Sequence, residues 1–225
     1  KPARVAFTNG ISYYDTDNGD LRFILAMDAD GANWNLGQTI DSDGVTGQYP
    51  SLRVVSGTPA ISDRDEGLGE LCFIRSSDAL GIDWNPPQTL DSDGSPGYWT
   101  SMELVDGYPA IAYHDGDTGE LRFIRASNAE GSAWDAVQTL DLGVSTSDGI
   151  ALAVIKGKPA LGYFGGGVLR YIRALDAAGS SWASAQTLDG AMPTGLYVSL
   201  VQVNGQAALS YQANDPGLLR YVRGF

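Results

Sequence analysis

The sequence has little of the side-chain chemistry on which many enzymes rely. Its 225 residues include one cysteine, Cys72, and one histidine, His114. One cysteine excludes an internal disulfide, and one histidine excludes a metal site built from several imidazoles. Cys72 lies in an apolar run, so we expect a small buried side chain in place of a reactive thiol. No nucleophile motif accompanies His114, and we expect no catalysis there.

Positive charge is also scarce. Lys and Arg number 14 against 27 Asp and Glu, which gives a formal net charge of −13. Recognition of phosphates needs clustered Lys and Arg, so we expect no nucleic-acid partner, and anionic membrane surfaces are disfavoured for the same reason. No apolar run is long enough to span a bilayer, and we expect no membrane insertion. Cations and neutral ligands such as sugars are the partners that this composition leaves open.

Glycine, by contrast, is abundant at 29 residues, and it punctuates an internal repeat of about 50 residues. A fifth, shorter copy ends the chain. The copies begin at Ile11, Ile61, Ile111, Leu161 and Leu209, and the first four contain Trp34, Trp84, Trp134 and Trp182. Repeats of roughly 20 to 50 residues are typical of solenoids, propellers and other arrays.

Each repeat predicts four short β-strands separated by turns. In the four-strand unit that contains Trp84 these are residues 52–55, 60–63, 70–75 and 84–90. The runs are rich in β-branched and aromatic residues and are bounded by Gly, Pro, Asp and Ser. A ring covers its terminal faces, whereas a linear array needs polar caps. The sequence therefore predicts an all-β fold, a five-bladed β-propeller of four-stranded antiparallel blades.

We expect one propeller domain over residues 1–225, but the closure of the ring is irregular because the fifth copy stops before its tryptophan strand. In one interpretation residues 4–8 form the first strand of blade one, and the last blade is incomplete. In another, residues 1–7 pair on the outside of blade five and close the ring. A third is that the chain is a piece cut from a longer array. The expected blades are at about residues 1–40, 48–90, 98–140, 149–188 and 196–225.

The turn before each tryptophan resembles a known motif. Residues 76–84, with Ser76, Asp78, Gly81 and Trp84, look like a stretched Asp-box, the S-x-D-x-G-x-x-W turn of sialidase-type propeller repeats. The unit is similar to Asp-box (BNR-like) repeats of bacterial secreted or surface proteins. This resemblance implies a propeller fold, a structural role for the turn, and an extracellular or cell-surface location. The arginine triad and the Tyr and Glu of sialidases do not map onto this chain, so we carry over no sialidase activity.

Acidic residues gather in the loops that lead from one repeat to the next. Asp41 and Asp43 recur as Asp91 and Asp93. Clustered carboxylates are hard oxygen donors, so these four are candidate calcium ligands, although no twelve-residue calcium loop is present. The alternative is Asx-turn chemistry, in which each Asp accepts hydrogen bonds from nearby backbone N–H groups. We expect no cofactor other than calcium.

Aromatic residues follow the same loops. Tyr49, Trp99 and Tyr197 stand where the chain enters the innermost strand of a blade, near the mouth of the central channel. Aromatic rings stack on the C–H faces of sugars, and neighbouring carboxylates such as Asp43 and Asp93 accept sugar hydroxyls. The alternative is packing between blades.

Two further repeated sets are expected to be structural. The tryptophans start the fourth strand in register, and we expect them in the core. The other set consists of the third-strand arginines Arg22, Arg122, Arg170 and Arg220, with Asp15, Asp65 and Asp115 as their expected cross-strand partners.

Together these patterns predict a non-enzymatic, lectin-like propeller that binds carbohydrate, such as a cell-surface glycan. The expected site comprises Tyr49, Trp99, Tyr197, Asp43 and Asp93, and no catalytic residue is singled out. The first alternative is a structural or protein-interaction module of a larger surface protein. The second is a glycoside hydrolase, which needs two carboxyl groups about 5 to 9.5 Å apart in one pocket.

Overall fold

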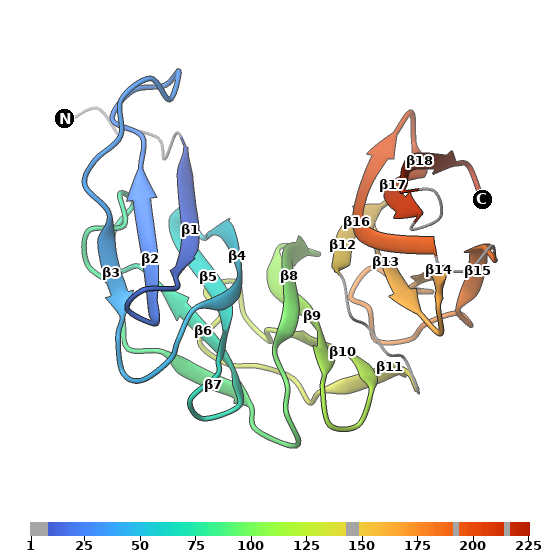
Figure 1. Cartoon of the computed structure of the whole chain (residues 1–225), viewed down its shortest axis with the longest axis horizontal. Coiled ribbons are helices and arrows are strands. Elements are labelled where there is room, and N and C mark those ends of the chain that lie inside the picture. Colours follow the sequence, from blue (N-terminus) through green and yellow to red (C-terminus); the bar gives the residue numbers. More distant parts are fainter. Residues whose placement is uncertain (1–8, 143–148, 191–193, 214–216) are drawn as a thin grey trace. The chain divides into compact units, whose positions relative to one another are not determined.

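The computed structural model describes residues 9–142, 149–190, 194–213 and 217–225, and in these the protein consists of strands and turns without a helix. The strands form five antiparallel sheets of three or four strands each (Figure 1). An all-β fold was predicted. Residues 1–8, on which both interpretations of ring closure depend, lie outside the described part. Across the described ranges, no helix is long and apolar enough to cross a membrane.

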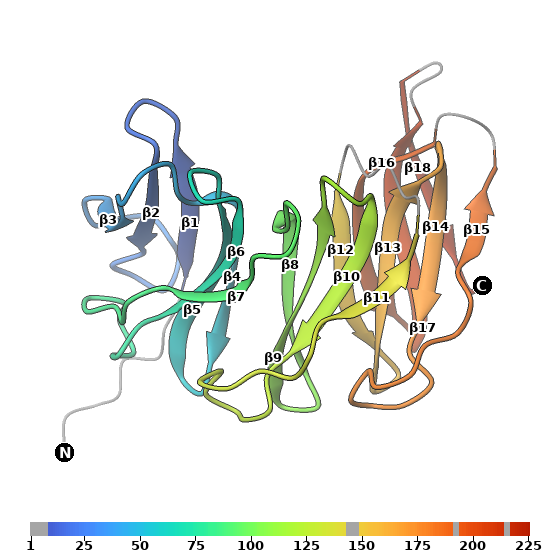
Figure 2. The ribbon, with the colours of Figure 1, turned by 90° about the horizontal axis from the view of Figure 1, so that it is seen from below.

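The sheets follow one another along the chain. Sheet 1 contains β1 (Gly10–Asp15), β2 (Asp20–Leu25) and β3 (Gln38–Asp41). Sheet 2 contains β4 (Gln48–Val55), β5 (Thr58–Asp65), β6 (Glu70–Arg75) and β7 (Gln88–Asp91). Sheet 3 contains β8 (Tyr98–Val105), β9 (Tyr108–Asp115), β10 (Glu120–Arg125) and β11 (Gln138–Asp141). Sheet 4 contains β12 (Ile150–Ile155), β13 (Lys158–Gly165), β14 (Val168–Arg173) and β15 (Gln186–Asp189), the last at one edge (Figure 2). Sheet 5 contains β16 (Thr194–Val203), β17 (Gln206–Ala213) and β18 (Leu218–Arg223).

The chain divides into two compact units. Unit 1 covers Lys1–Thr100 and holds sheets 1 and 2 together with the first residues of β8. Unit 2 covers Ser101–Phe225 and holds the rest of sheet 3 with sheets 4 and 5.

The first two strands of sheets 2 to 5 are joined by tight hairpins whose sequence sets their geometry. Both central residues have positive φ, as at Asp106 (φ 50) and Gly107 (φ 80). This is the type I′ turn, whose twist matches that of the flanking strands, and its second position favours glycine. The pairs Ser56–Gly57, Lys156–Gly157 and Asn204–Gly205 repeat it.

The second strand of each complete sheet is buried along almost its whole length. In β5, β9 and β13 every residue after the first is buried. Runs that are apolar on both faces, as expected from the sequence, fit strands that are covered on both sides. Cys72 on β6 is buried and free, as predicted, and His114 is buried at 8% exposure.

The fourth strand differs from its prediction. Trp84 makes only an isolated bridge with Ser76, and the outer strand β7 starts later, at Gln88. Between them lie Pro86 and Pro87, which have no N–H to give to a ladder. The tryptophan therefore belongs to a separate turn and not to the strand.

We call the four segments at residues 26–34, 76–84, 126–134 and 174–182 the Trp turns. In the second, the Asp78 carboxylate accepts backbone N–H groups of Leu80, Ile82 and Asp83 at 2.7 to 3.0 Å. The indole of Trp84 donates to the carbonyl of Gly81 at 2.8 Å. In the fourth Trp turn, hydrogen bonds from Ser181 and Ser180 hold the pKa of Asp176 well below its ordinary value. These carboxylates are thus turn caps.

Two of these tryptophans pack on the preceding sheet. Trp84 meets Phe23 of sheet 1 edge-on, with ring centroids 5.3 Å apart, and Trp182 meets Phe123 of sheet 3 at 5.1 Å. Trp34 is 37% exposed. The tryptophans were expected in the core, and this was wrong, because none of the four is buried. Trp84 and Trp182 cover buried phenylalanines from outside.

Close packing at the Trp turns predicts a difference between two glycines. Gly31 and Gly81 have nearly equal φ, 67 and 70, so alanine costs each about 1–2 kcal/mol of backbone strain. A Cβ at Gly81 would lie 2.8 Å from the Phe23 ring, whereas the nearest atom at Gly31 is at 3.6 Å. We expect Gly81→Ala to lose about 1–3 kcal/mol more unfolding free energy than Gly31→Ala. Urea denaturation of both variants measures this, and equal losses would contradict the packing argument.

Candidate functional site

In unit 2, sheets 3 and 4 and sheets 4 and 5 are each joined by a three-residue contact that we call the clasp. Asp141, the last residue of β11, accepts a hydrogen bond from the Tyr163 hydroxyl on β13 at 2.7 Å and another from Arg170 on β14. Asp189, at the end of β15, repeats this with Tyr211 and Arg220 at 2.9 and 2.7 Å. Burial, followed by the bond to Asp141, raises the pKa of Tyr163. One carboxylate faces one guanidinium, so the clasp carries no net charge.

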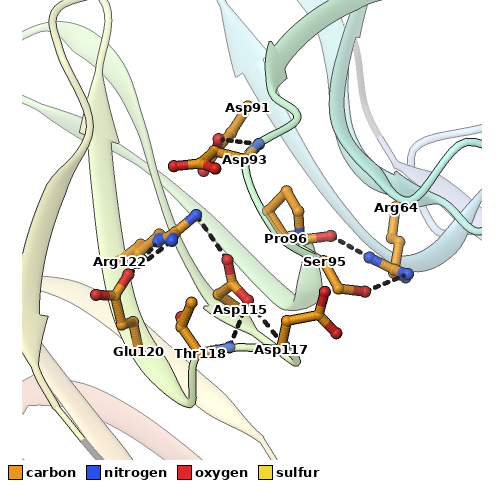
Figure 3. Close-up of polar contacts among 10 residues, drawn as sticks. All are labelled: Arg64, Asp91, Asp93, Ser95, Pro96, Asp115, Asp117, Thr118, Glu120 and Arg122. Carbon is orange, nitrogen blue, oxygen red and sulfur yellow. Dashed lines mark hydrogen bonds and ion pairs between the residues drawn. The ribbon is translucent and has the colours of Figure 1, made fainter.

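The repeated third-strand arginines only partly follow the prediction. Arg22 and Arg122 pair with Asp15 and Asp115 at 3.3 and 2.7 Å, as expected (Figure 3 shows the second pair). Arg170 and Arg220 pair instead across the sheets. In sheet 2 the third-strand position that holds arginine in the other sheets is Cys72, so Asp65 has no arginine there to pair with. Asp65 instead accepts the N–H of Leu68 at 2.9 Å.

In sheet 2, the tyrosine and the arginine of the clasp are replaced by other residues. In the strand register Tyr163 lies opposite Arg170, and Tyr211 opposite Arg220, whereas Asp63 lies opposite Cys72. Asp41 ends β3 as Asp141 ends β11. The place of a tyrosine and an arginine is therefore taken by a second carboxyl and a thiol. The guanidinium that would neutralise the carboxyl groups is gone.

Asp63 is consequently a buried carboxyl that has no cationic partner in the described parts of the chain. It is 1% exposed; Oδ2 accepts the N–H of Gly47 at 2.9 Å, and Oδ1 has no partner among the described residues. Burial raises the pKa of Asp63 to about 7, the hydrogen bond from Gly47 lowers it, and the nearby Asp41 and Asp65 raise it further. At neutral pH this carboxyl is therefore present in both protonation states, which is the condition for general acid–base chemistry.

The loop that binds Asp63 also carries the first of the predicted aromatic residues. Tyr49 lies two residues after Gly47, in an irregular part of β4 where the pairing with β5 shifts between Gln48 and Ser51. The Tyr49 ring is 4.5 Å from Trp99 and 5.6 Å from Tyr98, between ring centroids. It lines a pocket of about 380 Å³ with Tyr14 and Gln48. The structure thus brings Tyr49 and Trp99 together beside an open pocket.

The backbone of these aromatic residues is strained. Tyr49, Trp99 and Tyr197 have φ of 51, 56 and 49, whereas Gly149, at the matching position before β12, has φ 95. A bulky residue rarely adopts this region, and such strain gathers at functional sites. Thr100 helps to hold the turn, since its hydroxyl donates to the Tyr49 carbonyl at 2.8 Å. Strand irregularities of this kind re-aim side chains beside active sites.

A buried arginine lies on the opposite face of β5. Arg64 is 3% exposed and donates to Ser95 Oγ at 3.0 Å and to the Pro96 carbonyl (Figure 3). It also meets Glu66 at 2.6 Å and stacks 4.1 Å from the Tyr98 ring centre. Arg64 anchors the loop that presents Trp99.

The other predicted site residues stand apart from Asp63. Asp43 and Asp93 are exposed, and their backbone N–H groups donate to Asp41 and Asp91 Oδ1, each at 3.1 Å, in the Asx-turn arrangement. Of the calcium candidates, Asp41 is the one that acts on Asp63. In the parts of the chain that the structure describes, no group of three or more His, Cys, Asp or Glu is arranged to hold a metal. Tyr197 is 61% exposed in unit 2 and lines a pocket of about 330 Å³ with Tyr211 and Leu219.

Sequence reasoning missed Asp63, although a signal was present. Aligned by register, the five repeats carry Tyr13, Asp63, Tyr113, Tyr163 and Tyr211 at one position. The opposite position carries Arg22, Cys72, Arg122, Arg170 and Arg220. The paired exchange in one copy marks the site.

No family model matches the chain, and no curated protein matches it. Solved structures do. The NanB sialidase of Streptococcus pneumoniae gives a TM-score of 0.59 at 16% identity over 86% of this chain and 32% of its own. An exo-β-1,3-galactanase of Phanerochaete chrysosporium gives 0.59 at 10% identity over 98% of this chain and 58% of its own. An endo-arabinase of Bacteroides thetaiotaomicron gives 0.51 at 13% identity over 98% of this chain and 94% of its own.

These likenesses show a propeller-like fold of the sialidase and family-43 glycoside hydrolase type. The chain spans about a third of the sialidase. The similar structures are glycoside hydrolases, so the prediction of a non-enzymatic, lectin-like propeller was wrong. The prediction had rested on the sialidase residues that do not map onto this chain and on the aromatic residues near the expected channel, whereas glycoside hydrolysis needs only a pair of carboxyl groups.

The raised pKa of Asp63 predicts a pH-dependent stability. A carboxyl whose pKa is higher folded than unfolded stabilises the protein below its unfolded pKa of about 3.9, and this stabilisation disappears as pH rises through about 7. At about 1.4 kcal/mol per unit over roughly three units, the loss is on the order of 4 kcal/mol. We therefore compare the unfolding free energies of the wild type and of Asp63→Asn at each pH. The wild-type value minus the Asp63→Asn value should fall by on the order of 4 kcal/mol between pH 4 and pH 8.

Urea denaturation at several pH values measures this difference. Asp17→Asn, an exposed change in the β1–β2 turn, is the matched control and should keep the wild-type profile. A difference between the wild type and Asp63→Asn that does not change with pH would contradict the burial of a titrating carboxyl.

Proposed function

We propose that this chain is a glycoside hydrolase in which Asp63 serves as the general acid. The observation that carries the proposal is the buried Asp63 carboxyl, whose pKa is raised to about 7 beside Asp41 and Asp65. Cleavage of a glycosidic bond needs a carboxylic acid that protonates the leaving oxygen and a second carboxyl group across the sugar. An ordinary aspartate, with a pKa near 3.9, is almost wholly deprotonated at pH 7.

Asp41 supplies the second carboxyl group. It is half-buried at the end of β3, it interacts with Asp63, and it lies on the neighbouring sheet. Asp41 raises the pKa of Asp63 from the neighbouring sheet, whereas Asp65 shares β5 with Asp63 and is engaged with Leu68. In such a pair the group in the more apolar surroundings keeps its proton and acts as the acid. The separation of the two groups sets whether the anomeric configuration is inverted or retained.

Tyr49 and Trp99 form the sugar platform. Their rings lie 4.5 Å apart at strained backbone positions, and Tyr49 follows directly on the Gly47 loop that binds Asp63. Aromatic rings take the C–H face of a pyranose or furanose ring. The net charge of −13 opposes anionic glycans, so the substrate is a neutral polysaccharide.

The same proposal includes the architecture that the repeat predicts. The five sheets are the blades of one five-bladed propeller over residues 1–225, and the Trp turns are stretched Asp-boxes. The tight capping of Asp28 and Asp78 by backbone N–H groups supports a structural role for these turns. An extracellular or cell-surface location suits an enzyme that meets polymeric substrates.

The acid role of Asp63 predicts the effect of its removal. Asp63→Asn should lower kcat on neutral glycans by about 10²–10⁴-fold, because the amide cannot give a proton. The wild-type kcat/KM should fall as pH rises through about 7, as the proton donor is lost. Release of reducing sugar from arabinan, galactan and xylan, and hydrolysis of aryl glycosides, measure both, with Asp17→Asn as the fully active control. An Asp63→Asn protein as active as the wild type, or a folded wild type without hydrolytic activity on the panel, would overturn the proposal.

The platform predicts a different kinetic change. Trp99→Ala should raise KM by about tenfold and leave kcat nearly unchanged, because stacking binds ground state and transition state alike. Leu36→Ala is the control, since Leu36 is 93% exposed. A fall in kcat at constant KM would place Trp99 in the chemistry and contradict a platform.

A further inference from the structure

Strand β5 carries the candidate acid on one face and holds part of the sugar platform with the other. Successive side chains of a strand point to opposite faces, so Asp63 lies on one face and its neighbours Ser62 and Arg64 lie on the other. Ser62 and Arg64 bind the segment at residues 95–100, which includes Trp99 and belongs to unit 1 like β5 itself. The strand of the acid therefore also fixes one ring of the platform.

A buried pair of hydroxyl groups forms the first link. Ser62 is 0% and Thr100 9% exposed, and their hydroxyl oxygens lie 3.0 Å apart. A hydroxyl has one proton to donate, and Thr100 is closer to the carbonyl of Tyr49, at 2.8 Å, than to that of Ser62, at 3.2 Å. The Ser62 hydroxyl therefore donates to Thr100, which in turn donates to Tyr49. One chain of hydrogen bonds leads from β5 to the backbone of both platform residues.

These hydrogen bonds connect every part of the candidate site. Ser62 precedes Asp63 in the sequence, and Thr100 follows Trp99. The acid and the indole are thus joined through one peptide bond on each side of a single hydrogen bond. Tyr49 and Trp99 have φ of 51 and 56, a region that the surrounding structure has to impose on a bulky residue. Thr100 adjoins one of these strained residues and binds the carbonyl of the other.

Arg64 fixes the segment on the other side of Trp99. It donates to Ser95 Oγ and to the Pro96 carbonyl (Figure 3). Its guanidinium also stacks 4.1 Å from the centre of the Tyr98 ring. The indole is therefore held before and after its own position by alternate residues of one strand.

The fold itself does not need a hydroxyl at the position of Thr100. The matching residues in sheets 2, 4 and 5 are Pro50, Ile150 and Val198, which carry none. In unit 2 the matching pair still meets, since a Cβ on Gly162 would lie 3.0 Å from the Val198 side chain. Replacing both members of a buried hydrogen-bonded pair by apolar groups costs little stability. The hydroxyl pair therefore points to a role in the site.

We propose that Thr100 is a positioning residue, whose hydroxyl aligns the platform of Tyr49 and Trp99 with the carboxyl group of Asp63. This role rests on the proposed glycoside hydrolase activity. A sugar on the two rings has to present its glycosidic oxygen to the acid, and a displacement of about 1 Å costs on the order of 100-fold in rate. Thr100 is buried and acts through the two aromatic residues.

The test removes both hydroxyls in the double variant Ser62→Ala/Thr100→Val. Its apolar pair is of the kind that the other sheets carry, so the variant should fold, which urea denaturation checks. On the polysaccharide that the wild type cleaves fastest, we expect kcat to fall about 10–100-fold, because the bound sugar is misaligned. KM should change by less than about twofold, because both rings remain. Trp99→Ala should instead raise KM.

Three further variants complete the test. Thr100→Ser keeps the hydroxyl and should retain most of the wild-type kcat. Ser62→Ala alone removes the same link from the other strand and should lower kcat in the same direction. Thr89→Val is the matched control, because this exposed hydroxyl on β7 donates to Glu70 at 2.7 Å, and both kinetic constants should stay unchanged.

The outcomes separate this role from the activity on which it rests. If the wild type is active, Asp63→Asn is inactive and the double variant keeps the wild-type kcat, the positioning role is overturned and the hydrolase remains. A rise in KM at constant kcat would contradict alignment, since Thr100 would then contribute to binding alone. A shift of the pH profile in the double variant would mean that the change acts on the protonation of Asp63, which also contradicts alignment. A folded wild type without activity would overturn both proposals.

Discussion

Within each unit, the packing of a Trp turn on a phenylalanine of the preceding sheet is the contact on which the arrangement of neighbouring sheets depends. It needs three things at once: an Asp or Asn that caps the turn, a glycine with positive φ, and an indole that covers a buried ring. A sheet edge alone specifies no neighbour, because its polar groups pair with any strand. The aromatic contact selects which sheet becomes the neighbour, and it sets how the two sheets are aligned with each other. The clasp then adds a polar link at the far end of the outer strand.

The candidate site lies where the arginine of the clasp is absent. A Tyr–Arg pair balances Asp141 and Asp189, whereas Asp63 and Cys72 leave Asp41 without a cation. A buried carboxyl that has lost its counter-ion either takes up a proton or costs several kcal/mol, and the raised pKa of Asp63 reflects this. Since the rest of sheet 2 keeps the normal register, the fold tolerates the change. Two substitutions in one copy of a structural contact are enough to produce a buried carboxyl with a raised pKa.

The sequence predicted the all-β class and the bounds of β6, because the repeat and the turn residues are local signals. It misplaced the start of β7, since an isolated bridge at Trp84 looks like a strand when only β propensity is considered. It paired Tyr49 with Asp43, which is exposed, and overlooked Asp63. The pKa of Asp63 depends on burial and on Asp41, which is 22 residues away along the chain but adjacent across the sheets. Such proximity is a property of packing, and no window along the sequence contains it.

Gly149 shows how readily such a chain can change its specificity. It occupies the backbone position that holds an aromatic residue at Tyr49, Trp99 and Tyr197, and its φ is also positive, which costs a glycine no strain. Among the described residues, four repeats thus share one backbone position at which the side chain varies. Because the unit is repeated, one copy can change its sequence while the neighbouring copies keep the contacts that stabilise the fold. Redundancy of this kind is a simple physical route by which a repeated structural element acquires a new ligand.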